Sequence, residues 1–382
     1  MAQLLIPHSL ESRVGPRPGA VLEMVSPAPR DIWRGVLRDD PGATAQLTPA
    51  YFDAVVAATG GSDVSRFYQL RDGRQLLLPL VRRPSRFGLH LDASYPDGYG
   101  PGGMLATGGL LADDVRMVVK DLWGESLSVR IGGAPHTSEQ WSAGVLPGVS
   151  EEERRPVGVI DVAPGADRDP GAFRSTHLDG ETRQRLGRAV RLGVEVERDT
   201  TGRLVPVCYD IYRSGVERDI AGSELPPMVA RRRTLRAKPY ADLATIAAGT
   251  GEACRTFVAW FRGRPVAASM LLVQGDHASL WRSFRVPQLA APISADLLTV
   301  VTAIEDAIGS GCRTIDLVPS GEPVGGPHHK NSLGASTGSV VDLRIEPAGL
   351  ARLRAAGARA EGVLVRALTR SPASSTSGRP MP

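Results

Sequence analysis

Residues 254–284 read CRTFVAWFRGRPVAASMLLVQGDHASLWRSF, and this stretch decides the fold. It holds three apolar or alternating runs, 254–261, 266–273 and 277–284, separated by the turns RGRP and GD. Runs of this length, rich in β-branched and aliphatic residues and bounded by Gly and Pro, are typical of strands joined by tight turns. The stretch therefore predicts a three-stranded antiparallel meander.

A helix and a buried strand are expected after the meander. Residues 294–308 carry apolar side chains at helical spacing, with Ser294 at the N-cap position and Gly309 at the end. The run CRTIDLV at 312–318 has the composition of a buried strand, and the loop GGPHHKNSLGA at 325–335 comes after it. The order is meander, helix, strand, loop.

The first half of the chain repeats this order. A hairpin is predicted from 64–70 and 75–83 around the turn RDGR, with 88–94 as a third strand. A helix over 110–123 and a strand over 126–131 come next. Two copies of one unit account for both halves, and this inference rests on the order of the elements.

The segment between the two copies is mainly helical in composition. Helices are predicted over 181–192, 204–219 and 225–237, and the run VEVER after Gly193 predicts a strand. The expected organisation is an N-terminal segment 1–20, a first domain 21–165, a second domain 166–345, a C-terminal helix 346–370 and a disordered tail 371–382.

Nearly all of the basic residues are arginines. Of 45 basic residues, only Lys120, Lys238 and Lys330 are lysines, and Asn331 is the single asparagine. In so arginine-rich a chain, a retained lysine marks a position where a compact, titratable charge is needed, or it is a chance survivor. A net charge of +4, with arginine clusters at 183–191 and elsewhere, permits a polyanionic partner such as RNA.

Several classes of protein are disfavoured by composition. The three cysteines, Cys208, Cys254 and Cys312, are too few and too far apart for a disulfide framework or a zinc site. No run approaches eighteen apolar residues, so no membrane span is expected. The N-terminus lacks the pattern of a signal peptide, so we expect a cytoplasmic protein, with a monomer as the default.

Four segments resemble those of a known family. They are RQRLGRAVRLGVEVE (183–197), GCRTIDLVPSGE (311–322), HKNSLGA (329–335) and DASYPDGYGPGGM (92–104). In their order and spacing the chain resembles the Fem-type aminoacyltransferases, over roughly residues 25 to 345. The resemblance implies an α/β (α+β) fold of two tandem GNAT-like domains, each a mixed, mainly antiparallel sheet flanked by helices. GNAT denotes the N-acetyltransferase fold. The resemblance also implies that the segment 338–347 and the C-terminal helix 346–370 return to the first domain.

The resemblance implies a role for Lys330. The motif's lysine lies at the active site, where an ammonium would stabilise the oxyanion that forms when an amine attacks an ester. His329 stands where the family has an aromatic residue. Asp316 is a second catalytic candidate, which would accept a proton, hold Lys330 charged, or cap the loop backbone. His328 and His329 have no further ligands near them, so no metal is expected.

The sequence lacks the glycine-rich motif that binds acetyl-coenzyme A, and this bears on the acyl donor. Acetyl-coenzyme A enzymes of this fold cradle the pyrophosphate at a glycine-rich helix start, but the segment FRVPQLAAPIS (284–294) has no glycine and two prolines. QRLGRA (184–189) matches the pattern inside a helical run, and the glycine-rich 99–109 of the first unit lacks a basic residue. Aminoacyl-tRNA is therefore the expected co-substrate, with no other cofactor.

The expected reaction is amide formation, with the aminoacyl group passing to the amine of a peptidoglycan precursor or a specialised metabolite. An acyl-coenzyme A-dependent N-acyltransferase and a non-catalytic scaffold that binds RNA or protein are the alternatives. Each candidate for lining the donor and acceptor clefts also has a purely structural explanation. The candidates are Tyr95, Tyr99, Arg183, Arg188, Trp281, Arg282, Arg285, Ser320, His329 and Asn331.

Overall fold

A computed structural model gives the fold. The residues that it describes are 21–84, 90–96, 98–147, 150–162, 170–221, 228, 231, 234–235, 240–317, 332–347 and 349–350.

The first half contains four α-helices and nine strands within these residues. The helices are α1 (Arg30–Asp39), α2 (Pro49–Thr59), α3 (Ala112–Leu122) and α4 (Ser138–Ala143), with short 3-10 turns η1 (Ala45–Leu47) and η2 (Pro135–Thr137). The strands are β1 (Val21–Val25), β2 (Ser62–Asp63), β3 (Arg66–Leu70), β4 (Gln75–Leu78), β5 (Val81–Pro84), β6 (His90–Ala93), β7 (Leu105–Ala106), β8 (Ser128–Gly132) and β9 (Ser150–Asp161).

The second half is built around the predicted meander. Its strands are β10 (Val194–Asp199), β11 (Cys254–Phe261), β12 (Arg264–Gln274), β13 (His277–Arg285), β14 (Thr314–Leu317) and β15 (Ser336–Ile345). Its helices are α5 (Pro170–Thr176), α6 (Gly180–Arg191), α7 (Val205–Ala221), α9 (Tyr240–Thr250), α10 (Pro287–Ala290) and α11 (Ala295–Gly309), with 3-10 turns η4 (Gly251–Ala253) and η5 (Ala291–Ile293).

The meander is confirmed, and its turns show why. β11, β12 and β13 pair antiparallel, and β11 has the predicted bounds. Gly263 and Gly275 occupy the two turns with φ of 71° and 56°, a backbone region that glycine enters without steric cost. Helix α11 ends at Gly309 as predicted.

Ser294 is at the predicted N-cap position of α11, but the capping bond is absent. The residue has a left-handed φ of 54°, and its side chain accepts no hydrogen bond from the helix start. Its hydroxyl instead accepts a hydrogen bond of 3.4 Å from Nε of Arg185. The sharp turn out of η5 explains the difference, because it points the side chain away from the first turn of α11.

One predicted strand is wrong in detail. Residues 75–83 form two strands rather than one, and Pro79, which lacks a backbone N–H, stands at the break. β4 belongs to a four-stranded sheet of order β1-β3-β4-β7, whereas β5 joins a larger sheet and pairs with β6. The hairpin of β3 and β4 around Gly73 is confirmed.

Both halves contain the same parallel crossover. In the first half, β6 leads through α3 to β8, which pairs parallel to β6. In the second, β13 leads through α11 to β14, which pairs parallel to β13. The predicted duplication therefore appears as two strand–helix–strand units of one kind.

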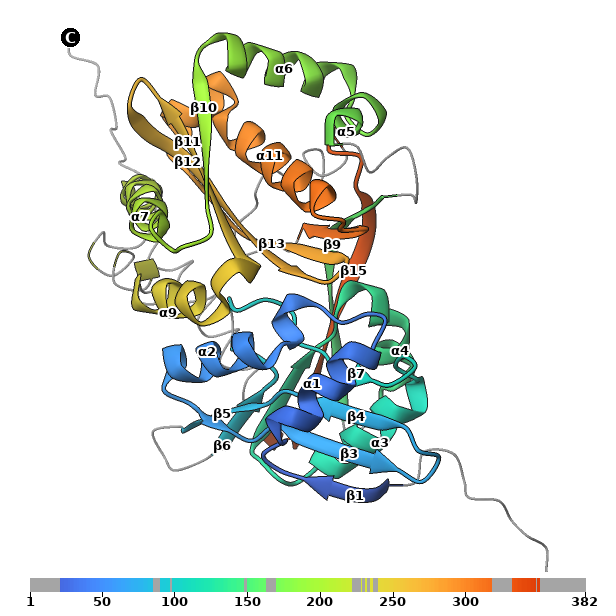
Figure 1. Cartoon of the computed structure of the whole chain (residues 1–382). Helices are drawn as coiled ribbons and strands as arrows, with labels where there is room; N and C mark the ends of the chain where they lie inside the picture. Colours follow the sequence, from blue (N-terminus) through green and yellow to red (C-terminus); the bar gives the residue numbers. More distant parts are fainter. Residues whose placement is uncertain are drawn as a thin grey trace, which may run out of the picture.

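The two halves exchange their last strands. β9 ends the first half but pairs with β14 of the second, and β15 ends the second half but pairs with β8 of the first. β9 and β15 also pair with each other over ten residues, from Ser336 opposite Val159 to Ile345 opposite Ser150. The result is one sheet of order β10-β11-β12-β13-β14-β9-β15-β8-β6-β5-β2, which runs through both halves (Figure 1).

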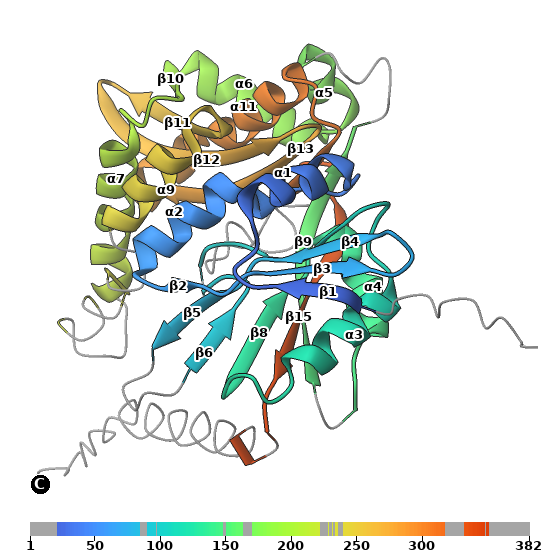
Figure 2. The same ribbon diagram turned by 60° about the horizontal axis from the view of Figure 1, so that its bottom comes forward.

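Apolar packing also joins the halves. Figure 2 shows α1 and α2 lying between the meander of the second half and the strands of the first. One hydrophobic cluster contains Phe52 of α2, Ile246 of α9 and Trp281 of β13. At the α2–α9 contact, a Cβ added to Gly249 would lie 2.7 Å from Cβ of Ala54. The two helices pack this closely because Gly249 has no side chain.

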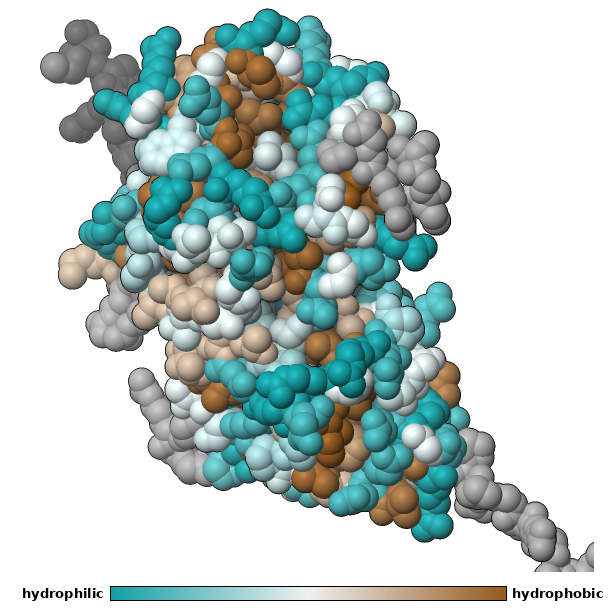
Figure 3. All heavy atoms as spheres, viewed as in Figure 1, coloured by the Kyte–Doolittle hydropathy of each residue, from teal (hydrophilic) through white to brown (hydrophobic). Residues whose placement is uncertain are grey.

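Some predictions fall outside the described residues. They are the N-terminal segment, most of the helix over 225–237, nearly all of the helix over 346–370 and the tail. Among the helices that the structure does describe, none alone is long and apolar enough to cross a membrane, although the bent pair Pro287–Ile293 and Ala295–Gly309 passes by length and composition. Figure 3 shows hydrophilic side chains over both halves of one face, with smaller hydrophobic patches between them.

Candidate active site

A buried histidine and aspartate meet where two parallel strands part. β13 and β14 pair only from His277 to Ser279 on β13, and then β14 ends while β13 continues. There, Nε2 of His277 lies 2.9 Å from Oδ2 of Asp316, and both side chains are buried. A carboxylate at this distance favours the imidazole tautomer with its hydrogen on Nε2, which leaves Nδ1 as an acceptor.

His136 of the first half faces this pair. It lies in η2, and its ring centroid is 6.4 Å from that of His277. Desolvation lowers the pKa of His136 below its ordinary value, and His277 lowers that pKa further, while Asp316 and Asp40 act in the opposite direction. His136 is nevertheless exposed. An accessible imidazole that is neutral at pH 7 is able to accept a proton.

Asp40 completes the charged groups of this region. It follows α1, and its two carboxylate oxygens accept hydrogen bonds from the backbone N–H groups of Gly42 (2.7 Å) and Ala106 (2.8 Å). Burial raises the pKa of Asp40, and these hydrogen bonds oppose the rise. A Cβ on Gly42 would lie 2.3 Å from Nε2 of His136, so only glycine lets the ring approach this backbone.

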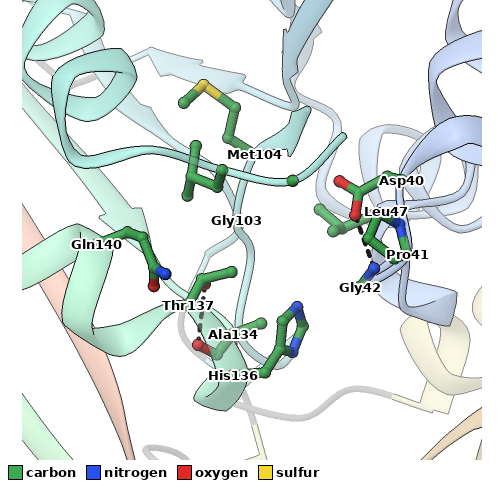
Figure 4. A pocket seen from close by; sticks show the side chains of 12 residues that line it. Asp40, Pro41, Gly42, Leu47, Gly103, Met104, Ala134, His136, Thr137 and Gln140 are labelled. Atoms are coloured by element: carbon green, nitrogen blue, oxygen red, sulfur yellow. Dashed lines mark hydrogen bonds between the residues drawn. The ribbon is translucent and has the colours of Figure 1, made fainter. Parts of the chain in front are cut away.

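A cavity of about 170 Å³ lies beside these groups in the first half. Figure 4 shows His136 across from the loop at Gly103 and Met104, with Asp40 beside that loop. Thr137 and Gln140 supply further polar side chains. Asp40 and His136 are the two titratable side chains among the described residues that line it, so a bound ligand would meet one carboxylate and one neutral imidazole.

Unpaired polar atoms gather where η1 meets β13. Oγ1 of Thr44, Nε2 of Gln46 and Nδ1 of His277 are buried without a hydrogen-bond partner among the described residues. Oγ of Ser279 donates to Oε1 of Gln46 at 3.3 Å, which ties the two halves together. Buried polar atoms normally have hydrogen-bond partners. At this contact between the two halves, which we call the seam, water or a ligand can therefore supply the partners that these three atoms lack.

The two tyrosines of the first half lie at the same seam. Tyr95 is 1% exposed, and its hydroxyl donates to the carbonyl of Gln46. Tyr99 donates its hydroxyl to Asp242 of α9. Both side chains thus have partners within the fold, and their contact with a substrate stays a prediction.

Trp281 and Arg282 are buried on β13. The guanidinium of Arg282 lies 4.6 Å from the centroid of the Trp281 ring. The glycine-rich loop of the first half covers them, since a Cβ at Gly98 would lie 3.6 Å from Nη2 of Arg282. Their predicted role in a cleft is likewise untested.

Arg285 is the last residue of β13, and its Nη1 forms a salt bridge of 2.6 Å with Asp296 in the first turn of α11. Arg183 and Arg188 are exposed on α6, at the end of the second half far from the first (Figure 1). Arg183 donates to the carbonyls of Ser175 and Leu178. The structure therefore does not bring these arginines together with Asp316.

Four predicted site residues lie outside the described residues: Ser320, His329, Lys330 and Asn331. The loop that holds them follows β14 directly after Asp316 and Leu317. Within the described residues, no group of three His, Cys, Asp or Glu side chains is arranged to hold a metal ion.

His136, His277 and Asp40 were not singled out from the sequence. One signal was available for His277, because it alternates with Ser279 along β13 and so shares a polar face with it. His136 and Asp40 carry no such local pattern. They join the site only because the exchanged strands and η1 bring the halves together.

Comparison with known protein families finds a match in the second half of the chain. Residues 180–331 match the family model described as an acetyltransferase (GNAT) domain. The prediction of a GNAT-like fold is confirmed. The matched family model agrees with the general prediction of an acyltransferase. No curated protein matches the chain.

Two solved structures share the architecture. A conserved protein of unknown function from Bacteroides thetaiotaomicron VPI-5482 superposes with a TM-score of 0.51 at 10% identity, covering 84% of this chain and 100% of that one. The structure of FemX superposes with a TM-score of 0.50 at 8% identity, covering 84% of this chain and 97% of FemX. At such low identities these likenesses show the fold alone.

Proposed function

We propose that the protein is an acyltransferase of GNAT type that forms an amide bond, passing an aminoacyl group from aminoacyl-tRNA to an amine. The observation that carries this proposal is the chemistry at the starts of α11 and α3. In acetyl-coenzyme A enzymes of this fold, a helix start of this kind holds the pyrophosphate on backbone N–H groups. Here a carboxylate stands at each of the two helix starts.

Asp296 stands in the first turn of α11 and is held by Arg285. The segment before the helix forms α10 and η5 instead of a glycine-rich loop, and Pro287 and Pro292 supply no N–H. The N–H groups of Leu289, Ala290 and Ser294 bond to carbonyls within these turns. A pyrophosphate at this helix start would meet the carboxylate of Asp296 in place of a glycine-rich loop.

A carboxylate also occupies the start of α3. Asp114 accepts a hydrogen bond of 2.9 Å from the N–H of Leu111, and Nη2 of Arg74 lies 2.6 Å from its carboxylate. Asp114 is 1% exposed. A pyrophosphate at either helix would meet a carboxylate that already neutralises the helix dipole, so coenzyme A is disfavoured in both halves.

An aminoacyl-tRNA donor needs basic side chains for phosphates instead. α6 presents Arg183, Arg185, Arg188 and Arg191, and none of the four is ion-paired with a carboxylate of the described residues. Nε of Arg185 reaches Ser294 at the start of α11, so this basic helix borders the segment that lacks a pyrophosphate cradle. Contacts of arginine with phosphates would position the tRNA without selecting its sequence.

Lys330 is the residue that we propose for oxyanion stabilisation, by resemblance to the Fem-type motif. Its loop follows β14 in the chain, and β14 holds Asp316 of the His277–Asp316 pair. A lysine ammonium presents a compact charge to one oxygen, which the planar guanidinium of arginine does not. This need explains a retained lysine in a chain that otherwise uses arginine almost throughout.

The deciding experiment offers both donors in one assay. The purified protein is incubated with a pool of aminoacyl-tRNAs, each amino acid isotopically labelled, and with acetyl-coenzyme A, in a cell extract as the source of amines. Loss of label from one tRNA with recovery in an amide supports the proposal and names the amino acid. Consumption of acetyl-coenzyme A while every tRNA stays charged would overturn it in favour of an acyl-coenzyme A enzyme. Salt-sensitive RNA binding without any acyl transfer would instead leave a scaffold.

A further inference from the structure

We propose that His136, supported by the His277–Asp316 pair across the seam, is the proton acceptor for an amine bound in the cavity of the first half. The inference deepens the proposed amide-forming function and rests on it. It assigns the cavity as the place where the attacking amine binds.

The cavity has the charges that an amine requires. Asp40 offers carboxylate lone pairs beyond the two that Gly42 and Ala106 occupy, and these would attract an ammonium ion. His136 also lines the cavity, is exposed, and is accessible to a ligand. A site lined by one carboxylate and one neutral base suits a cation that must give up a proton before the reaction is complete.

The groups behind His136 form a chain of titratable side chains. The ring of His277, on β13, lies 6.4 Å from the ring of His136 between centroids. Nε2 of His277 is hydrogen-bonded to Oδ2 of Asp316, on β14, at 2.9 Å. Nδ1 of His277 is buried without a partner among the described residues. Gln46 and Ser279 supply the neutral polar groups around this pair. A positive charge that forms on His136 would thus face the carboxylates of Asp40 and Asp316.

The ammonium ion that binds beside Asp40 first loses one proton to solvent. The neutral amine nitrogen then attacks the ester carbonyl carbon, forming the C–N bond and a tetrahedral intermediate with N–H⁺ and O⁻. The proton on nitrogen passes to a ring nitrogen of His136. The C–O bond to the ribose then breaks, and the ribose oxygen takes the proton from the imidazolium. His136 ends neutral, and the products are an amide and the free tRNA hydroxyl.

The first test does not depend on turnover. Diethyl pyrocarbonate reacts with neutral, accessible imidazoles, and its attachment to each histidine is followed by mass spectrometry as a function of pH. We expect His136 to react with a midpoint below the usual histidine value of about 6.5. In His277→Gln the midpoint moves up, because the neighbour that lowers it is gone while Asp316 remains. A midpoint at or above 6.5, or one unmoved in the variant, would overturn the inference.

The second test uses the donor and amine found in the pooled assay. His136→Gln should lower kcat by about a hundredfold or more with little change in KM, and should remove the acid limb of the kcat/KM profile. His277→Gln should keep that limb and move it to higher pH, which a loss of folding would not do. The control is His90→Gln, which changes an exposed histidine on β6.

The outcomes separate the two proposals. If the wild-type protein transfers no aminoacyl group, the proposed function fails, whatever the labelling shows. If it transfers one and His136→Gln does so at the wild-type rate with the same pH profile, the assignment of His136 alone is wrong.

Discussion

Single residues in this chain are informative where they depart from its overall composition or allow an unusually close contact. Arginine replaces lysine almost everywhere, and glycine stands at positions such as Gly42 where any side chain would strike His136. Asp316 was predicted from its place at the end of a buried strand. Its partner His277 was not, because a pairing between two strands 39 positions apart in the chain leaves no mark in the local sequence.

Lys330→Met tests the residue on which the oxyanion argument depends. Loss of one stabilising donor should cost about a hundredfold or more in kcat. Acyl transfer from the labelled aminoacyl-tRNA measures the effect, and Lys120→Met on α3 is the matched control. Turnover of Lys330→Met within about tenfold of wild type would contradict the assignment.

His136 also links stability to pH. Its pKa is lower in the folded protein than in the unfolded chain, so the unfolded state binds the proton first as the pH falls. The folded protein therefore loses stability from about pH 6.5 downward to the folded-state pKa. Urea unfolding at pH 7.5 and pH 5.5 should give a smaller stability difference for His136→Gln than for wild type. An equal difference in both proteins would show that His136 does not titrate abnormally.

At the scale of elements, the sequence predicted best where turns enforce the strand ends. β11 to β13 were foreseen because Gly263 and Gly275 mark both turns of the meander. Strand 75–83 was misjudged because Pro79 divides it between two sheets. α2 and α9 were missed because their apolar residues are not confined to one face. α1 was also missed, although Trp33 and Val36 give it one apolar face.

The contact between α2 and α9 depends on one glycine. Gly249→Ala would place a Cβ 2.7 Å from that of Ala54, so the helices must move apart, at a cost of about 1–3 kcal/mol in unfolding free energy. Gly187→Ala on α6 is the control, because its nearest neighbour is the flexible side chain of Arg191. That change should be neutral or stabilise by up to about 1 kcal/mol. Equal effects of the two substitutions in denaturant titrations would contradict close packing at Gly249.

The basic face of α6 should control the salt dependence of tRNA binding. Arg188→Ala and Arg191→Ala should each reduce the slope of log affinity against log salt by about 1, with little change between tRNAs of different sequence. Arg203→Ala is a suitable control because Arg203 already pairs with Glu197 at 2.5 Å. Filter binding from 50 to 200 mM salt measures the slopes. Unchanged slopes for both α6 variants would remove this helix from the tRNA surface.

The sequence revealed only part of what holds the whole molecule together. Duplication was predicted from the order of elements, and the return of residues 338–347 to the first domain was expected from the resemblance. The pairing of β9 with β14 was not predicted, because β9 could pair with its own half using the same local pattern. The exchange joins both halves in one sheet, and an apolar cluster from both halves reinforces it. The site at the seam follows from this assembly, with His136 and Asp40 from one half and His277 and Asp316 from the other.

Unfolding should therefore be cooperative over both halves. Calorimetry should give a single transition whose van't Hoff and calorimetric enthalpies agree. A fragment of residues 166–382 lacks β9, so β14 loses one neighbour and β15 loses both, and we expect it to be insoluble unless residues 1–165 are co-expressed. Two separate transitions, or a soluble second half with protected β14 amides in hydrogen exchange, would contradict this.

The strand exchange is the arrangement expected if the chain arose by duplication of a single unit. A polypeptide with only one of these units would have a terminal strand shaped to complete another molecule's sheet, and two copies would satisfy each other as a strand-swapped homodimer with twofold symmetry. Joining two copies of the gene end to end would place both subunits on one chain without altering a single strand pairing. The two halves were then free to diverge, with one copy retaining Asp316 and its histidine and the other presenting His136 and Asp40 to them.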